Sequence, residues 1–239
     1  MPSVEGGGME INMNIEDAIF GRRSIRRFDE EKKVPQEIID KIIEAGIHAP
    51  SACNFQAWKM IVIDDEETIK KLLEVGCSSV ISKSRQGIVV VYRNDLFVTG
   101  YKHKDYIQSA SAAIENMLLM AYSLGIATCW LCDLPSGNVL RHILEIPENF
   151  DIIAYIAFGY PTTGKSSSKS EMEYHYGTEK KFEAHERKYS LEQVICPNRF
   201  KSVDGDITTF SLKNNKKTVV ERIKRKANIL LHNVMMHRK

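Results

Sequence analysis

Four short segments carry most of the residues whose types and spacing point to chemistry. The first is Arg22-Arg-Ser-Ile-Arg-Arg-Phe28, which places four arginines and a serine hydroxyl within seven residues. Guanidinium groups match phosphate oxygens in geometry and charge, and a cluster of them repels itself unless an anion lies among the side chains. The segment predicts an anion site. The alternatives are a solvated basic turn and a nucleic-acid patch.

The second segment is Ala49-Pro-Ser-Ala-Cys-Asn-Phe-Gln-Ala-Trp58, placed where an expected helix ends and an expected strand begins. Its small residues let a ligand approach the backbone closely. The side chains of Ser51, Asn54 and Gln56 offer donors and acceptors suited to a ribityl chain or the edge of a heterocycle. A turn rich in Pro, Ser and Asn that binds nothing is the alternative, and this segment taken alone favours it.

The third segment, Leu124-Gly-Ile-Ala-Thr-Cys-Trp-Leu-Cys-Asp133, reads as a strand that ends in a loop whose free amides can meet a planar ring. Cys129 and Cys132 have the spacing of a metal or redox pair. A zinc site needs two more close ligands, and a redox dithiol needs a helix start, so neither is expected. The fourth segment, Phe158-Gly-Tyr-Pro161, is a strand-to-loop turn. The seven histidines form no ligand pattern, and no metal is expected.

Composition places the chain among globular proteins. Its 239 residues are 43% hydrophobic and 27% charged, with a net charge of +2, which excludes a wholly disordered or collagen-like chain. Five scattered cysteines do not make a disulfide framework. No apolar run reaches the roughly 18–20 residues of a membrane-spanning helix, so no membrane partner is expected. Residues 1–12 lack the features of a signal peptide and read as a flexible leader, which predicts a cytoplasmic protein.

Hydrophobic periodicity and turn residues predict a mixture of helices and strands. Helices are expected at 15–21, from Pro35 to Pro50, and at 66–75, 105–124 and 135–144; strands are expected at 59–63, 87–92, 127–131 and 152–158. Because helices and strands do not alternate strictly, an α+β fold is expected rather than a doubly wound one.

The last forty residues differ in charge from the rest. Residues 201–239 hold ten Lys or Arg against three Asp or Glu, which predicts a domain over 13–199 and a basic, partly helical extension over 200–239. Apolar residues recur at helical spacing in 218–237. They are expected to pack on the protein itself or on a dimer mate, and the alternative is a binding module that uses this basic helix on anionic membrane or nucleic acid. No nucleic-acid partner is expected.

Taken in order, the four segments resemble the nitroreductase family of FMN-dependent oxidoreductases. The family elements are R-R-S-x-R-x-F, A-P-S-x-x-N-x-Q-P-W, L-G-L-G-x-x-W and G-Y-P, and the resemblance covers about residues 15–195. It implies a central mixed, mainly antiparallel sheet flanked by helices in an intertwined homodimer. Two FMN molecules would then lie at the subunit interface.

The resemblance also assigns roles to residues. Arg22, Arg23, Ser24 and Arg26 match positions that hold the phosphate, ribityl chain and pyrimidine edge of FMN. Ser51 and Asn54 match positions that reach the flavin of the other subunit, flanked by Pro50 and Ala52. Trp130, Leu131 and Cys132 match the loop over the flavin ring, and Arg187 lies in a closing segment whose basic residues return to the phosphate. Arg26 is the candidate for tuning the reduced flavin, with Lys83 second.

The implied reaction passes a hydride from NADH or NADPH through flavin N5 to a conjugated acceptor such as a nitroaromatic or a quinone. No catalytic side-chain acid or base is required. Reductive dehalogenation and flavin breakdown are the alternatives on the same fold. Two departures from the family pattern stand out: Ala57 replaces the usual proline, and Cys132 replaces a glycine, so that its side chain narrows access to the ring.

Overall fold

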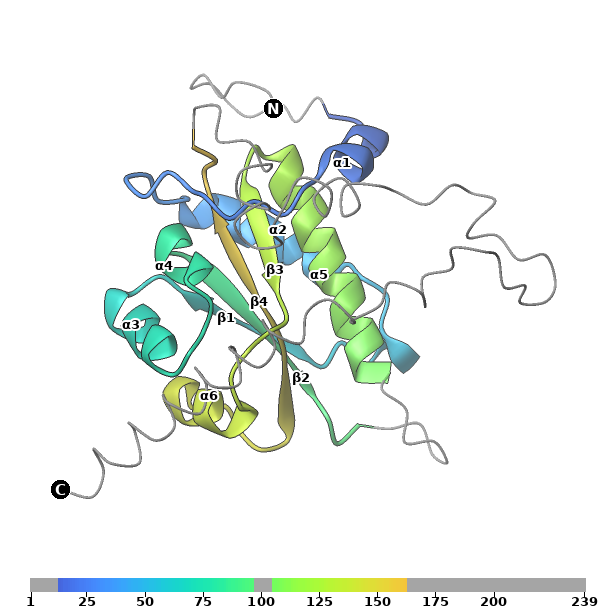
Figure 1. The fold of residues 1–239 in the computed structure, drawn as a ribbon. Coiled ribbons are helices and arrows are strands. Elements are labelled where there is room, and N and C mark those ends of the chain that lie inside the picture. Colours follow the sequence, from blue (N-terminus) through green and yellow to red (C-terminus); the bar gives the residue numbers. More distant parts are fainter. Residues whose placement is uncertain (1–12, 97–104, 163–239) are drawn as a thin grey trace, which may run out of the picture. The chain divides into compact units, whose positions relative to one another are not determined.

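The structure is a computed structural model, and it describes residues 13–96 and 105–162 (Figure 1). The helices are α1 (Ile15–Gly21), α2 (Gln36–Ile47), α3 (Glu66–Glu74), α4 (Val80–Ser84), α5 (Asp105–Ser123) and α6 (Gly137–Leu144). A 3-10 turn, η1 (Ala52–Asn54), follows α2. The strands are β1 (Trp58–Ile63), β2 (Gly87–Arg93), β3 (Ala127–Leu131) and β4 (Phe150–Gly159). The predicted leader, 1–12, and extension, 200–239, lie outside the described residues.

The four strands form one sheet in the order β1-β2-β4-β3, with every neighbouring pair antiparallel. In the described ranges the parallel pairing is confined to one isolated bridge, between Ser24 and Thr128. All but the last residue of β2 is buried, as its continuous apolar run predicts for a strand covered on both faces. The expected α+β fold with a mainly antiparallel sheet is confirmed.

Local signals explain where several elements begin and end. The Asn14 side chain accepts a hydrogen bond from the Asp17 N–H at the start of α1, and Asp65 caps α3 through the Thr68 N–H. Gly125, with a φ of 74°, ends α5. The short helix α4 was not expected because five residues are too few to show a period. The helix predicted from Pro135 begins two residues later, at Gly137.

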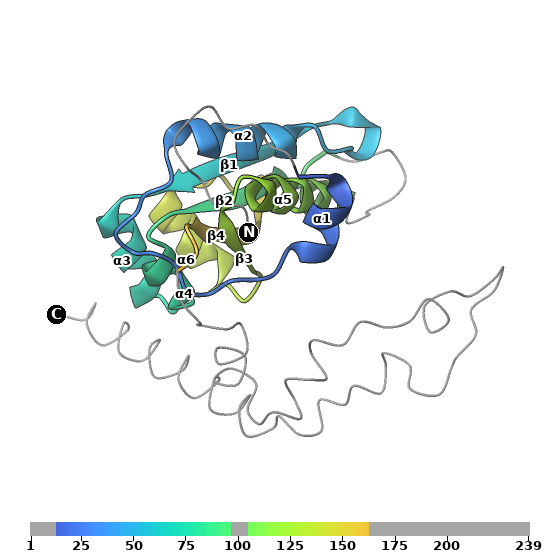
Figure 2. The same ribbon diagram turned by 90° about the horizontal axis from the view of Figure 1, so that it is seen from above.

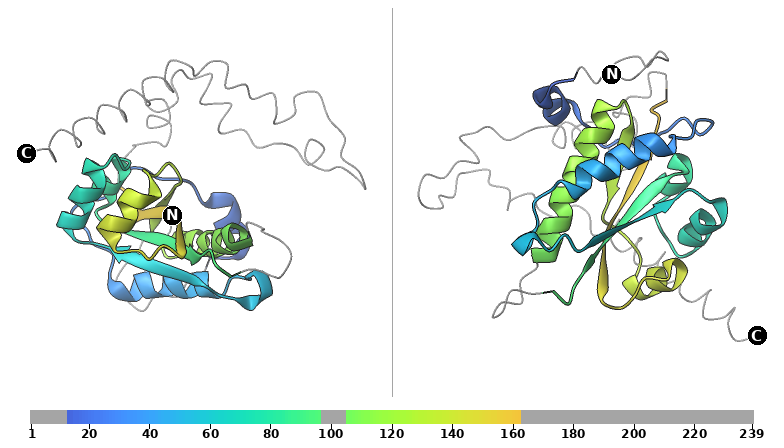
Figure 3. Two further views of the ribbon diagram at one scale, coloured as in Figure 1. Left: turned by 90° about the horizontal axis from the view of Figure 1, so that it is seen from below. Right: turned by 180° about the vertical axis from the view of Figure 1, so that it is seen from behind.

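Two layers of helices cover the sheet, and alternate residues of β2 face each layer. Ile88 and Val90 belong to the core formed with α2 and α5, whereas Val89 and Val91 face the core formed with α3, α4 and α6. Figure 2 shows the second group of helices on the side of the sheet away from α2, and Figure 3 shows α2 crossing α5. Because helices of the same chain cover both faces of the sheet, the sheet gives the loops at its edges a fixed support.

Candidate functional site

Three of the four segments singled out from the sequence meet at β3 and the end of β4. The Ile25 N–H donates to the Thr128 carbonyl over 2.8 Å, next to the Ser24–Thr128 bridge. Phe28 then forms an antiparallel bridge with Pro161. These backbone contacts hold the chain after α1 beside β3. The first segment (22–28), the third (124–133) and the fourth (158–161) therefore lie next to one another.

The arginines of the first segment point to different surroundings. The Arg22 side chain is 25% exposed, and its Nε lies 3.4 Å from Glu115 Oε1 on α5. Arg26 is half-buried, with Nη1 at 3.4 Å from the Ser24 carbonyl. Arg23 is exposed and donates to the carbonyls of Phe20 and Arg22, at 2.7 and 2.8 Å. Arg22, Ser24 and Arg26 form a half-buried set, while Arg23 bonds to the end of its own helix.

Successive side chains of β3 face opposite sides of the sheet, and this determines how the loop after β3 is oriented. Trp130 packs against the core of α2 and α5, while Leu131 packs against the opposite core. The indole Nε1 of Trp130 is buried and has no hydrogen-bond partner within the described ranges. Cys132, the first residue past the strand, is exposed and lines a pocket, and partial burial raises the pKa of its thiol.

The second segment adopts a strained backbone. Cys53, Asn54 and Gln56 have φ values of 48°, 56° and 47°, in the left-handed region that non-glycine residues seldom adopt. Hydrogen bonds hold this shape: the Gln56 N–H donates to Ser51 Oγ over 3.0 Å, and Gln56 Nε2 donates to Asn54 Oδ1 over 2.8 Å. Pro50 and Asn54 are exposed. Such strain, stabilised by its surroundings, is typical of functional loops.

Within one chain, the second segment does not join the other three. The Ala52 N–H donates to Ser109 Oγ in the second turn of α5, whereas Gly21 lies against Tyr122 near the end of that helix. Ser109 and Tyr122 are 13 positions apart, or about 20 Å at 1.5 Å per helical residue. Ser51 and Asn54 are thus placed at the start of α5, and α1 at its end (Figure 1).

The structure also identifies positioning residues that the sequence reading missed. Glu115 pairs with Arg22, and Ser109 anchors η1 through Ala52. A signal for Glu115 was present, because it is the acidic residue in the middle of a helix that is rich in apolar residues. Arg187, predicted to contact the phosphate, lies outside the described residues. Residues 13–96 and 105–162 contain no cluster of His, Cys, Asp and Glu suited to a metal, and no helix long and apolar enough to span a bilayer.

Comparison with known proteins extends these observations. The model of the nitroreductase family matches residues 19–109 and 88–160. A protein of Archaeoglobus fulgidus, provisionally named NADH dehydrogenase/NAD(P)H nitroreductase, is 37% identical over 150 residues, which cover 62% of this chain and 85% of its own.

Two solved structures share the fold. A provisional nitroreductase of Desulfovibrio desulfuricans in complex with FMN is 26% identical with a TM-score of 0.61, over 80% of this chain and 99% of that one. An FMN-dependent nitroreductase of Clostridium difficile is also 26% identical, with a TM-score of 0.55, over 67% of this chain and 95% of that one. The matched sequence, the sheet order and the meeting of three motifs at β3 agree: this chain belongs to the nitroreductase family.

Proposed function

We propose that the chain is an NAD(P)H-dependent FMN oxidoreductase that reduces a small conjugated acceptor such as a nitroaromatic or a quinone. The observation that carries the proposal is the half-buried set Arg22, Ser24 and Arg26, held beside the loop of Trp130 and Cys132. Membership of the nitroreductase family, one solved relative in complex with FMN and a second named FMN-dependent support it.

The residues present fit FMN. The Nε of Arg22 is buried and is held in an ion pair with Glu115. The Nε1 of Trp130 is a buried donor that no hydrogen bond in the described ranges satisfies. A buried unsatisfied donor destabilises a fold by about 1–3 kcal/mol, so such donors are expected where a ligand supplies the acceptor. The set combines two guanidinium groups with a hydroxyl, which suits a phosphate monoester and a ribityl chain.

The protein's contribution is binding and orientation, while FMN, when bound, supplies the hydride-transfer chemistry. Arg22 and Ser24 bind the phosphate and ribityl end. Arg26 places a positive charge where negative charge develops on reduction. The loop of Leu131 and Cys132 would hold the flavin ring through its backbone, and the Cys132 side chain would limit access to it. No side chain is assigned as acid or base.

A second subunit completes the site in this proposal. Ser51 and Asn54, with Pro50 and Ala52 beside them, lie at the far end of α5 from α1 and reach the flavin site of a partner chain. Ile15, Ile19 and Phe20 of α1 are 70%, 50% and 72% exposed, which is an apolar surface suited to a subunit contact. We also propose that residues 13–199 form one domain, that residues 200–239 form a basic extension, and that the protein is cytoplasmic.

The test is the visible spectrum of the purified full-length protein, followed by chromatography of the cofactor released on heating. We expect a flavin band, FMN as the released species, and oxidation of NADH or NADPH that depends on an added acceptor. FAD as the released species, or no binding at micromolar FMN, would contradict the proposal. A panel of a nitroarene, a quinone and a halogenated phenol separates nitro or quinone reduction from reductive dehalogenation.

A further inference from the structure

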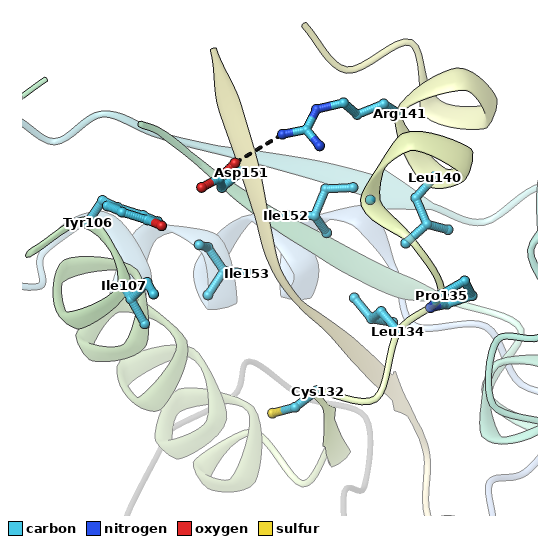
Figure 4. Close-up of a pocket in the computed structure, with 11 residues that line it drawn as sticks. Tyr106, Ile107, Cys132, Leu134, Pro135, Leu140, Arg141, Asp151, Ile152 and Ile153 are labelled. Atoms are coloured by element: carbon cyan, nitrogen blue, oxygen red, sulfur yellow. Dashed lines mark hydrogen bonds and ion pairs between the residues drawn. The ribbon is translucent and has the colours of Figure 1, made fainter. Parts of the chain in front are cut away.

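A pocket beside the β3–α6 loop shares Cys132 with the proposed flavin site, and its other lining residues have no role in cofactor binding above. Its volume is about 360 Å³, which is within the range of small-molecule sites. The first turn of α5 forms one wall, and the loop from Cys132 to Pro135 with α6 forms the other (Figure 4). β3 ends at Leu131, opposite Tyr155, so it does not pair with the first residues of β4. These first residues of β4 form the floor of the pocket. The pocket thus extends from the loop predicted to face the flavin toward the far end of β4.

The lining of the pocket combines apolar and polar surface, and its charged groups gather at one end. Ile107, Leu134, Leu140 and Ile153 give the walls an apolar surface. Arg141 and Asp151 lie at the end away from Cys132, joined by an ion pair of 3.0 Å (Figure 4). A ligand that fills the pocket therefore has an apolar body and one polar end.

The acceptor at that polar end is already engaged. Asp151 Oδ1 accepts from Arg141 Nη2 at 3.0 Å and from Asn94 Nδ2 at 2.9 Å. Burial, and then the nearby Asp151 carboxylate, raise the pKa of Tyr106, so its phenol stays protonated. Asp151 thus already accepts hydrogen bonds from two side chains of the protein.

The donors of Arg141 are only partly engaged. Each hydrogen bond that the Arg141 side chain makes within the described residues goes through Nη2, to the Phe150 carbonyl and to Asp151. Its Nε is buried with no partner in residues 13–96 and 105–162, and Nη1 lies against Gly137, the first residue of α6. No side chain caps α6, and a helix start favours negative charge. The polar end therefore offers Nη1 of Arg141 and the uncapped start of α6 to an acceptor on a ligand.

We propose that this pocket binds the acceptor through a carboxylate, so that the preferred substrates are conjugated or aromatic carboxylates whose anionic end meets Arg141. The ring then lies among Ile107, Leu134 and Ile153, and its reducible group lies toward Cys132. The role as acceptor rests on the proposed function. In the first two-electron step, a nitroarene carboxylate takes a hydride from NAD(P)H and a proton from water, becomes the nitroso compound and releases water.

Binding is tested with benzoate and benzamide on the full-length protein by isothermal titration calorimetry, because the two probes share shape but not charge. We expect benzoate to bind about ten times more tightly, as a charge-assisted hydrogen bond predicts. Arg141→Gln should remove this preference. Arg85→Gln, which deletes an equal charge at the end of α4, should keep it. Ile107→Trp should fill the pocket and weaken both probes without touching Arg141.

Equal binding of benzoate and benzamide by the wild type, or an unchanged preference in Arg141→Gln, would overturn the inference. Loss of benzoate binding in Arg85→Gln would also overturn it, since a general charge effect would then be the cause. Steady-state rates with 4-nitrobenzoate and 4-nitrobenzamide separate this from the proposed function. If both compounds are turned over with equal KM, the proposed oxidoreductase function stands and the carboxylate site is excluded. If the protein binds benzoate but takes up no FMN, the carboxylate site stands and the proposed function is excluded.

Discussion

At the scale of the residue, the arginine segment shows how similar side chains acquire different roles. Arg22 is turned inward by Glu115, Arg26 is half-buried, and Arg23 bonds to the carbonyls that end α1. Composition alone treats the arginines as one positive cluster. Burial and the nearest acceptor decide which of them is free to hold an anion.

We expect Arg22→Ala to weaken FMN binding by about 1–3 kcal/mol, the usual contribution of a charge-assisted hydrogen bond to a half-buried anion. The measurement is fluorescence titration of the apoprotein with FMN. Arg85→Ala removes an exposed arginine that pairs with Glu66 and serves as the control, with no change expected. Equal FMN affinity in wild type and Arg22→Ala would remove Arg22 from the phosphate site.

Cys77 predicts a pH dependence of stability. Burial raises the pKa of this thiol from 9.0 to about 11 in the folded protein. The unfolded chain therefore loses this proton first, and the stabilisation is complete below pH 9 and lost as the pH rises toward 11. We expect wild type to lose up to about 2 kcal/mol more than Cys77→Ala across that range, after allowance for solvent screening. Urea unfolding at several pH values measures this, and parallel curves for the two proteins would contradict it.

At the scale of the element, the sheet depends on close contacts that only particular residues allow. Gly87 begins β2 opposite Ala157, and a Cβ built there would lie 2.2 Å from the Tyr155 ring. Tyr155 is 1% exposed and has no room to move aside. The φ of Gly87 is not in the left-handed region, so a glycine is required here for space and not for its backbone conformation.

Gly87→Ala should therefore destabilise the protein by about 1–3 kcal/mol, the usual effect of overpacking a buried site. The measurement is the midpoint of thermal unfolding. Lys59→Ala, at an exposed position of the adjacent strand β1, is the control and should shift the midpoint much less. A melting temperature equal to that of wild type would show that Tyr155 has an alternative position.

At the scale of the whole molecule, the separation of the flavin segments along α5 makes the proposed dimer part of the site. One chain holds Arg22 and Trp130 near β3, and its Ser51 and Asn54 at the start of α5. Since the exposed apolar residues of α1 and the strained turn η1 belong to different ends of this helix, a two-fold partner can bring them together. Flavin affinity and subunit association are then linked.

We expect Phe20→Glu to shift the mass measured by light scattering from dimer toward monomer, and to reduce FMN affinity in parallel. The reason is that a charge replaces an aromatic side chain that is 72% exposed in the single chain and apolar in character. Glu16→Gln on the same helix is the control and should stay dimeric. A wild-type monomer that still binds FMN would contradict the two-chain site.

The class of fold, the family and the identity of the motifs could be predicted from the sequence, because periodicity, turn residues and short signatures are local properties. The burial of β2 on both faces and the length of α5 were also predictable, the latter to within one residue. It also showed that Cys132 departs from the family pattern. Five-residue α4 left no such signal, since a single turn cannot display a period.

How those motifs combine depends on tertiary contacts. A hydrogen bond between Ile25 and Thr128 brings the first and third segments together, while Ser109 places the second segment elsewhere. The ion pair of Arg22 with Glu115, and the pocket between α5 and α6, arise from residues far apart in the chain. Contacts of this kind depend on the packing of two helical layers against the sheet, which local sequence patterns do not encode.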